Sequence, residues 1–283
     1  KGILTAVING GSASNITLEG NLSVTVTAGA SNDIGALAGR AFETEISTIT
    51  NLAIINVNTD RIVDVGGIVG YSSNSQIAYS SNYGPVNVAV GEVSSTYSYS
   101  VGGIVGAISA VNSSTNSISY SYNATSVLAG YVDSTDTSDD SEPPALSTAP
   151  GNYYVGGVVG HSNVKTLTID HCYNSGAIRS GNKSNGVDDG VSYAAGIIAY
   201  GANANVTNCH NEGGIEALAA SPVTQFEWVA NSVEEAATKG FYTLVLNQIN
   251  DRNVFAYSIG KINSGTMDSN SESSNVRGYS VFA

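Results

Sequence analysis

The sequence predicts an all-β protein, a parallel β-helix or β-solenoid of about six coils with a small α+β cap at the C-terminal end. Three observations predict this fold. An apolar phrase recurs, a second phrase follows it each time, and both are short β-branched runs bounded by Gly, Asn and Ser. We expect the solenoid over residues 1–220, with an insertion at 131–150, and the cap over residues 221–283.

The first phrase is "VGGIVG", which begins at Val65 and again at Val101, and returns as "VGGVVG" at Val155. "AAGIIA" and "IGALAG" are weaker copies. Aligned on the second glycine, the column contains Ala36, Gly67, Gly103, Gly157 and Gly196. The intervals are 31, 36, 54 and 39 residues, and the long one contains the insertion. Units that recur at such a period stack on one another, because none can bury its apolar face alone.

The second phrase begins with an aliphatic residue and has an asparagine five places later. It reads "IAYSSNYGPVNV" from Ile77 and "IDHCYNSGAIRSG" from Ile169. The asparagine column is Asn21, Asn82, Asn123, Asn174 and Asn211. "ITNLAIINV" near Ile49 is interpreted as a degraded copy with Ile54 in the asparagine position. Asparagine tolerates tight corners and stacked amides can hydrogen-bond along an axis, so we expect a structural ladder.

The glycine phrase is interpreted as a strand with an aliphatic residue on each face. Residues two apart share a face, so Gly67 lies with Val65 and Val69, whereas Ile68 lies on the opposite face. Glycine in a strand is tolerated where another chain segment comes close. The phrase is therefore expected to be buried on the core side and covered on the other side by a neighbouring segment or subunit.

The amino-acid composition limits the kinds of partner that the protein is expected to bind. Hydrophobic residues make up 42% of the chain and charged residues 12%, with a formal net charge of −13. This acidity excludes nucleic acid and anionic membranes or polyanionic sugars as partners, because these need a basic surface. There is no apolar run near eighteen residues, so direct membrane insertion is not expected. A low content of charged residues together with a high content of Ser, Thr, Asn and Gly is typical of an extracellular, cell-surface β-protein.

The two phrases together resemble the GLUG repeat, whose pattern of glycine, leucine, any residue and glycine gives the family its name. The best match is "GGVVGHSNVKTLTIDHCYNSGAIRSG", Gly156 to Gly181, and the resemblance covers roughly residues 30 to 220. "IGALAG" and "AAGIIA" each lack one glycine of the pattern. The resemblance implies a module of a large bacterial surface protein, as in adhesins and the non-catalytic parts of immunoglobulin A-cleaving metalloproteases. It implies no catalytic residue.

The histidines and cysteines include two adjacent pairs, His171-Cys172 and Cys209-His210. Four such residues suggest a zinc site. In the repeat alignment, however, the cysteines occupy one face and the histidines the other, so one metal ion cannot collect all four. We expect stacked buried thiols in a column with Ser80 and Ser121. Adjacent coils lie at a distance that permits a disulfide, so a Cys172–Cys209 bond stays open.

Tyrosines gather before the glycine phrases, at Tyr97, Tyr99, Tyr153 and Tyr154. Stacked exposed aromatic rings suit sugar rings, so these four are glycan-binding candidates. Because Tyr99 and Tyr153 share a column with Val63, ladder packing in the interior is the favoured interpretation. The column of His161, with Arg40, Tyr71, Ala107 and Tyr200, is variable and is expected to be solvated.

The insertion is acidic. "DSTDTSDDSE" contains carboxylates of the type that bind calcium, at Asp133, Asp136, Asp139, Asp140 and Glu142. Their spacing matches no EF-hand loop, and the composition favours a solvated insertion. Calcium is thus the one cofactor hypothesis. There is no H-E-x-x-H, G-x-S-x-G or phosphate-binding glycine motif, so the sequence indicates no enzyme of these classes.

The repeat pattern of the preceding residues ends near residue 220. Ser221 and Pro222 are typical of a helix start, and Val223, Phe226 and Val229 follow helical spacing up to Gly240. "FYTLVL" and "VFAYSI" are expected to be strands, and Trp228 to pack among them. Solenoid ends need covering, so this region is interpreted as a cap. The alternative is an assembly element in which "RGYSVF" adds to a neighbouring copy.

The function that follows is a structural or adhesive surface solenoid. Its expected partners are a glycan, a surface protein of a host or neighbouring cell, or copies of itself. One alternative is a non-catalytic module of a secreted protease or glycan-active enzyme. Another is a β-helix glycoside hydrolase or lyase, which a carboxylate-lined groove with stacked tyrosines would favour.

Overall fold

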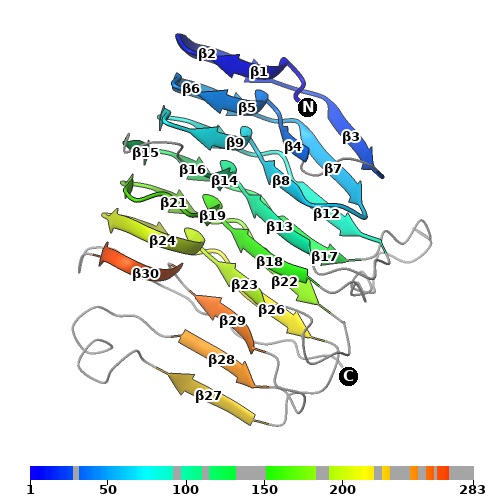
Figure 1. Cartoon of the computed structure of the whole chain (residues 1–283), viewed down its shortest axis with the longest axis vertical. Coiled ribbons are helices and arrows are strands. Elements are labelled where there is room, and N and C mark those ends of the chain that lie inside the picture. The colour runs from blue at the N-terminus through cyan, green and yellow to red at the C-terminus, as the bar shows by residue number, and fades with distance from the viewer. Residues whose placement is uncertain are drawn as a thin grey trace.

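The computed structural model describes residues 1–27, 32–91, 97–109, 115–131, 151–182, 191–219, 225–229, 243–247, 253–257 and 260–267. These residues form only strands and their connections, and the strands are stacked in parallel coils along the long axis of the molecule (Figure 1). The predicted parallel β-solenoid is therefore confirmed. The described residues contain no helix that is long and apolar enough to cross a membrane.

Each coil passes through three sheets in the same order. In one coil, β8 (Val63–Gly66) belongs to the 8-stranded sheet. β9 (Val69–Ser73), β10 (Gln76–Ala78) and β11 (Ser81–Asn82) belong to the 16-stranded sheet, and β12 (Val86–Val90) belongs to the 6-stranded sheet. The next coil repeats the order, so strands that are neighbours in a sheet are one coil apart in the sequence (Figure 1). The apolar side chains from all three sheets meet in one continuous core.

The 8-stranded sheet begins with six parallel strands: β4 (Asn32–Gly35), β8 (Val63–Gly66), β13 (Tyr97–Gly102), β18 (Gly151–Gly156), β23 (Ser192–Ala195) and β29 (Asn253–Tyr257). Two antiparallel strands extend it, β28 (Thr243–Asn247) and β27 (Gln225–Val229). The 6-stranded sheet contains β3 (Asn21–Val26), β7 (Ile54–Thr59), β12 (Val86–Val90), β17 (Val127–Tyr131), β22 (Ile178–Asn182) and β26 (Ile215–Ala219).

The 16-stranded sheet covers two successive sides of each coil. The first side contains β1 (Thr5–Asn9), β5 (Ala38–Phe42), β9 (Val69–Ser73), β14 (Val105–Ile108) and β19 (Val159–Ser162). The second side contains β2 (Ser12–Leu18), β6 (Glu45–Asn51), β10 (Gln76–Ala78), β15 (Asn116–Ser119) and β20 (Leu167–Asp170). β24 (Ile198–Thr207) and β30 (Gly260–Met267) span both sides. Short strands follow the second side: β11 (Ser81–Asn82), β16 (Tyr122–Asn123), β21 (Tyr173–Asn174) and β25 (His210–Asn211).

The glycine phrase turns a corner instead of forming one strand. β8 ends at Gly66 and β9 begins at Val69, so Gly67 and Ile68 make the corner between two sheets. A Cβ on Gly67 would lie 2.0 Å from the Gly103 carbonyl oxygen of the next coil and 2.6 Å from Asn82 Cγ. The prediction of one continuous strand was wrong, but the reason given for the glycines, a close approach, is confirmed. Ile68 is fully buried.

The asparagine column is a continuous buried ladder. The side-chain amide of each residue donates to the next at 2.7–2.9 Å, in the order Asn51, Asn82, Asn123, Asn174 and Asn211. The assignment in the first two coils was wrong by three residues. Ile46, not Ile49, pairs with Ile77, which places Asn51 in the ladder. Asn21 pairs with Ile54 in the 6-stranded sheet and lies outside it.

The C-terminal region differs from the prediction. Residues 225–229 form strand β27 instead of the predicted helix, and their alternating sequence "QFEWV" suits a strand at the end of a sheet. The two predicted strands are present as β28 and β29, and β29 and β30 continue the parallel stack. The remainder of the predicted helix, "RGYSVF" and residues 132–150 of the insertion lie outside the described residues.

Candidate functional site

The tyrosines proposed from the sequence as glycan ligands divide into two environments. Tyr99 and Tyr153 pair in register with Val63, and both are fully buried, with ring centroids 4.8 Å apart. Both are core residues, as predicted from ladder packing. Their alternative assignment as glycan ligands was wrong. Tyr97 and Tyr154 are half-buried, and the Arg61 side chain donates to the Tyr97 hydroxyl at 3.3 Å.

Tyr154 belongs to an aromatic cluster on the outer side of the corner between the 8-stranded and 16-stranded sheets. The cluster consists of Tyr154, His161, Tyr193 and Tyr200. It packs on Ala195 and Ala199, which form a small apolar group separate from the main core. Burial lowers the pKa of His161 to about 4. The predicted column of His161 is confirmed. Its side chains are mostly half-buried instead of fully solvated, because the 8-stranded and 16-stranded sheets meet there.

The same outer corner carries a carboxyl pair in the N-terminal coils. Asp33 is buried and paired with Arg40, and its neighbour Asp64 hydrogen-bonds with it and with Ser100. Desolvation and the adjacent Asp33 charge raise the pKa of Asp64 to about 7. Glycosidases hold their two carboxyl groups about 5–10 Å apart, with the substrate or water between them. Two carboxyl groups in hydrogen-bond contact leave no such space, so this pair does not fit that chemistry.

The cysteines lie in the predicted column. Cys172 and Cys209 are buried free thiols, and the Cys172 backbone amide donates to Cys209 Sγ at 3.4 Å. Ser121 occupies the same position in the preceding coils, after Ser80. The histidines point to the outer face, and among the described residues no group of three or more ligating side chains is placed to hold a metal ion. The calcium candidates Asp133, Asp136, Asp139, Asp140 and Glu142 lie outside the described residues.

Two rows of aromatic side chains cover the outer face beside this thiol column. The first row is Tyr79, Tyr120 and His171, and the second is Tyr122, Tyr173 and His210. We call these six residues the aromatic bench. Ring centroids in each row are 4.7–5.5 Å apart with interplanar angles of 7–19°. Tyr83 lies edge-on to Tyr122 at 5.9 Å.

The bench is open to solvent. Tyr79 is 61% exposed and Tyr120 48% exposed. Rings in contact lie about 3.5–4 Å apart, so parallel rings with centroids 5.0 Å apart are offset and leave part of each face uncovered. A shallow open pocket lies between the two rows, lined by Tyr120, Ser121, Tyr122, His171 and Tyr173.

The first row has an unusual backbone. Six successive coils place a residue of positive φ at this bend: Asn15 (57°), Thr48 (56°), Tyr79 (50°), Tyr120 (48°), His171 (50°) and Asn208 (52°). The left-handed region suits asparagine but costs about 1–2 kcal/mol for most other residues. Asparagine is used at both ends of the column, and aromatic residues are used at its centre.

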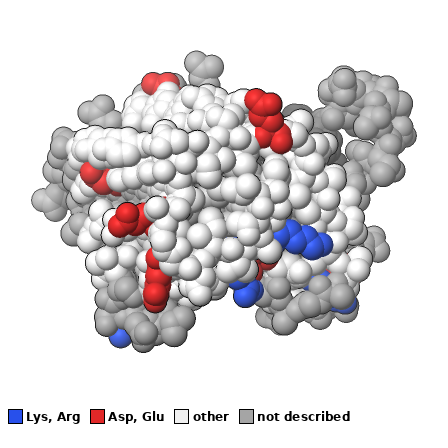
Figure 2. Space-filling view, turned by 90° about the horizontal axis from the view of Figure 1, so that it is seen from above, with Lys and Arg blue, Asp and Glu red and all other residues white. Residues whose placement is uncertain are grey.

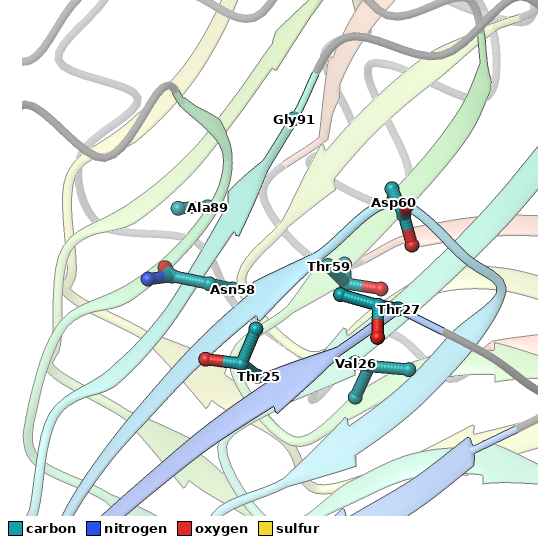
Figure 3. A pocket seen from close by; sticks show the side chains of 8 residues that line it. All are labelled: Thr25, Val26, Thr27, Asn58, Thr59, Asp60, Ala89 and Gly91. Carbon is teal, nitrogen blue, oxygen red and sulfur yellow. The ribbon is translucent and has the colours of Figure 1, made fainter.

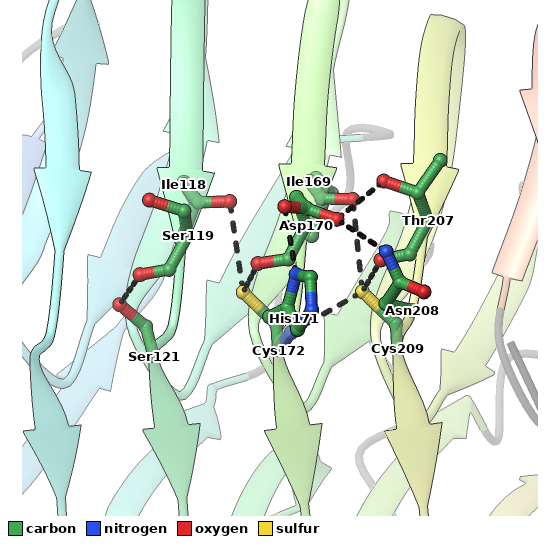
Figure 4. A network of polar contacts seen from close by, with 10 residues as sticks. All are labelled: Ile118, Ser119, Ser121, Ile169, Asp170, His171, Cys172, Thr207, Asn208 and Cys209. Atoms are coloured by element: carbon green, nitrogen blue, oxygen red, sulfur yellow. Dashed lines mark hydrogen bonds and ion pairs between the residues drawn. The ribbon is translucent and has the colours of Figure 1, made fainter. Parts of the chain in front are cut away.

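Two carboxylates stand at one end of the pocket. Asp170 accepts hydrogen bonds from His171 Nδ1 at 2.8 Å, Thr207 Oγ1 at 2.6 Å and Asn208 Nδ2 at 3.0 Å (Figure 4). Burial acts to raise its pKa, but these hydrogen bonds outweigh it and lower the pKa. Glu212 accepts from the Tyr173 hydroxyl and pairs with His210 at 3.1 Å. The Tyr173 and His210 hydrogen bonds lower the pKa of Glu212.

Another depression lies on the 6-stranded sheet. Thr25, Asn58 and Asp60 are among the side chains that line it (Figure 3). It has no aromatic side chain among its lining residues, and its polar groups come from adjacent strands and from the residues that directly follow them. The aromatic bench combines apolar faces with convergent polar groups, which is the composition expected of a small-molecule site. We therefore take the bench as the candidate functional site.

The sequence analysis missed the bench although a signal was present. Tyr79 and Tyr120 stand two places after the leading aliphatic residue, in the column recognised for His171. Their outward direction depends on the left-handed bend, which alternation along a strand does not predict.

Comparisons with protein-family models, with curated proteins and with solved structures found no match for this chain.

Proposed function

We propose that this protein is an extracellular bacterial surface protein, an adhesive β-solenoid that binds a glycan on its aromatic bench. Aromatic rings with exposed faces pack against the apolar faces of sugar rings, and tyrosine hydroxyls meet the sugar hydroxyls. The two rows are two residues apart, at most about 7 Å, which leaves a track one sugar wide along the solenoid axis. A saccharide chain on this track would meet a pair of rings in each of the two central coils, Tyr120 with Tyr122 and His171 with Tyr173. The coil on either side offers a single ring, Tyr79 or His210.

The observation that carries the proposal is the left-handed backbone beneath the exposed aromatic residues. Strained backbone that persists where an easier residue is available is a reason to infer function. Ring stacking returns about 0.5–1.5 kcal/mol per pair. The row has two stacked pairs but three strained residues at about 1–2 kcal/mol each, so stacking offsets only part of the strain. Stability alone therefore does not explain Tyr79, Tyr120 and His171.

The proposed extracellular location is supported by the low charge of the surface. On the described part of the face in Figure 2, charged side chains are few and the basic ones form no continuous patch. The low share of charged residues in the chain, 12%, agrees with the resemblance to GLUG repeats. The same bench would serve a binding module of a larger secreted protein.

The experiment compares wild type with a triple variant, Tyr79→Asn, Tyr120→Asn and His171→Asn. Binding to an array of neutral oligosaccharides is measured together with the free energy of unfolding. We expect the triple variant to lose glycan binding while its stability stays within about 2 kcal/mol of wild type or rises, because asparagine relieves the strain.

The matched control is Thr48→Asn. It relieves strain in the same left-handed column but lies outside the pocket. It should gain about 1 kcal/mol and keep full binding. The proposal fails if wild type binds no glycan, or if the triple variant binds as well as wild type.

A further inference from the structure

We infer that the aromatic bench selects saccharides with free amino groups, meaning oligomers of amino sugars whose amines are not acetylated. This inference rests on the proposed function and assigns the class of glycan. It comes from the asymmetry of the bench, which is tyrosine-rich toward Tyr79 and ends in two histidine–carboxylate pairs.

The first observation is the place of the carboxylates. Asp170 contacts His171 and Glu212 contacts Tyr173, and both contacted residues line the pocket. Both carboxylates are also linked to the following coil. Asp170 accepts a hydrogen bond from Thr207 of that coil, and Glu212 is itself part of it. They therefore stand at the same end of the track, one beside each aromatic row.

The second observation is their remaining capacity to accept hydrogen bonds. A carboxylate accepts about four hydrogen bonds. Asp170 accepts three from its protein partners and Glu212 two, and the Glu212 side chain is 52% exposed. Each has at least one free acceptor position, and an ammonium group offers three donors and a positive charge. Charge-assisted hydrogen bonds of this kind are stronger than those between neutral groups.

The third observation is the charge around the pocket. No lysine or arginine is among its lining residues, and the chain carries a net charge of −13. An acidic saccharide would meet two carboxylates and no lysine or arginine in the pocket lining. A neutral saccharide would use the rings alone, and an amino sugar would use both.

The experiment measures dissociation constants of the whole chain for three oligosaccharides of equal length by calorimetry. They are a β-linked amino-sugar hexamer, its fully N-acetylated form and a uronic-acid hexamer. At low salt and a pH at which the amines are protonated, we expect the amino-sugar hexamer to bind about fivefold more tightly than the acetylated form. The acidic hexamer should bind most weakly, and the preference should shrink as salt rises.

Two variants test whether the two carboxylates cause the preference for amino sugars. Glu212→Gln and Asp170→Asn should each reduce the ratio of amino-sugar to acetylated binding, and together they should abolish it. Glu45→Gln is the control, since it removes one exposed carboxylate from β6, outside the pocket. Because Glu212 is exposed, its variant tests the inference even if Asp170→Asn fails to fold.

The outcomes are distinct. Equal binding of amino and acetylated hexamers, or a preference unchanged in the Glu212→Gln variant, overturns this inference and leaves the glycan proposal standing. If the wild-type protein binds none of the three hexamers, both this inference and the glycan proposal are overturned.

Discussion

Two tyrosine stacks of nearly equal geometry lie on opposite sides of the solenoid wall. Tyr99 and Tyr153 have centroids 4.8 Å apart and are fully buried, whereas Tyr79 and Tyr120 have centroids 5.0 Å apart and are half-exposed or more. Each pair stacks because adjacent coils place like residues one strand spacing apart. Stacking in a repeat protein therefore says nothing about function, and the side of the sheet decides whether a ring belongs to the core or to a surface.

The largest expected difference between the stacks is in stability. Tyr153→Ala should cost about 3–5 kcal/mol, because it opens a cavity beside Tyr99 in a packed core. Tyr79→Ala should cost no more than about 1.5 kcal/mol, because it removes a single exposed ring stack. Urea unfolding of both variants measures the difference, and similar losses would show that the bench is a structural element.

The outer corner should show a smaller, pH-dependent effect. Asp64 has a pKa of about 7 in the folded protein and 3.8 as its ordinary value, so the folded state binds this proton more tightly. Its contribution to stability is complete below about pH 4 and is lost as the pH rises through 7. Asp64→Asn mimics the protonated form and should match wild type near pH 4 but melt several degrees higher at pH 8.

That test is read as the melting temperature of both proteins from pH 4 to 8. Parallel curves would mean that Asp64 ionises in the folded protein as it does in the unfolded chain. The bench variant Tyr79→Ala serves as the control, since the Tyr79 ring stacks on another tyrosine and its loss should shift the curve equally at every pH.

The smallest effect is expected in the thiol column beneath the bench. Cys172→Ser and Cys209→Ser place in these coils the residue that Ser121 provides in the preceding one, so each should cost about 1 kcal/mol or less. Burial raises the pKa of the Cys172 thiol, so native protein should react slowly with thiol reagents. Two thiols should titrate after unfolding without reductant, and none would demonstrate a disulfide.

The sequence predicted the column structure more accurately than the surface. Gly67, Asn82 and Cys172 were assigned to columns correctly, because a repeat that stacks in register shows its columns as spacing in the chain. The first two coils slipped by three residues because Ile46 and Ile49 are both aliphatic and both buried. Only strand pairing distinguishes them.

What the sequence determined by itself is the repeat, the β-solenoid and the buried ladders, because local pattern and period are written along the chain. Only the tertiary structure decided that the glycine phrase turns a corner, that His161 is covered and that Tyr79 and Tyr120 point outward. The direction of the two tyrosines depends on the sign of φ at single bends, and the burial of His161 depends on two sheets that meet beside it. The columns themselves recur along the chain, but neither the sign of φ nor the contact between two sheets can be read from them, since both arise from where the backbone turns.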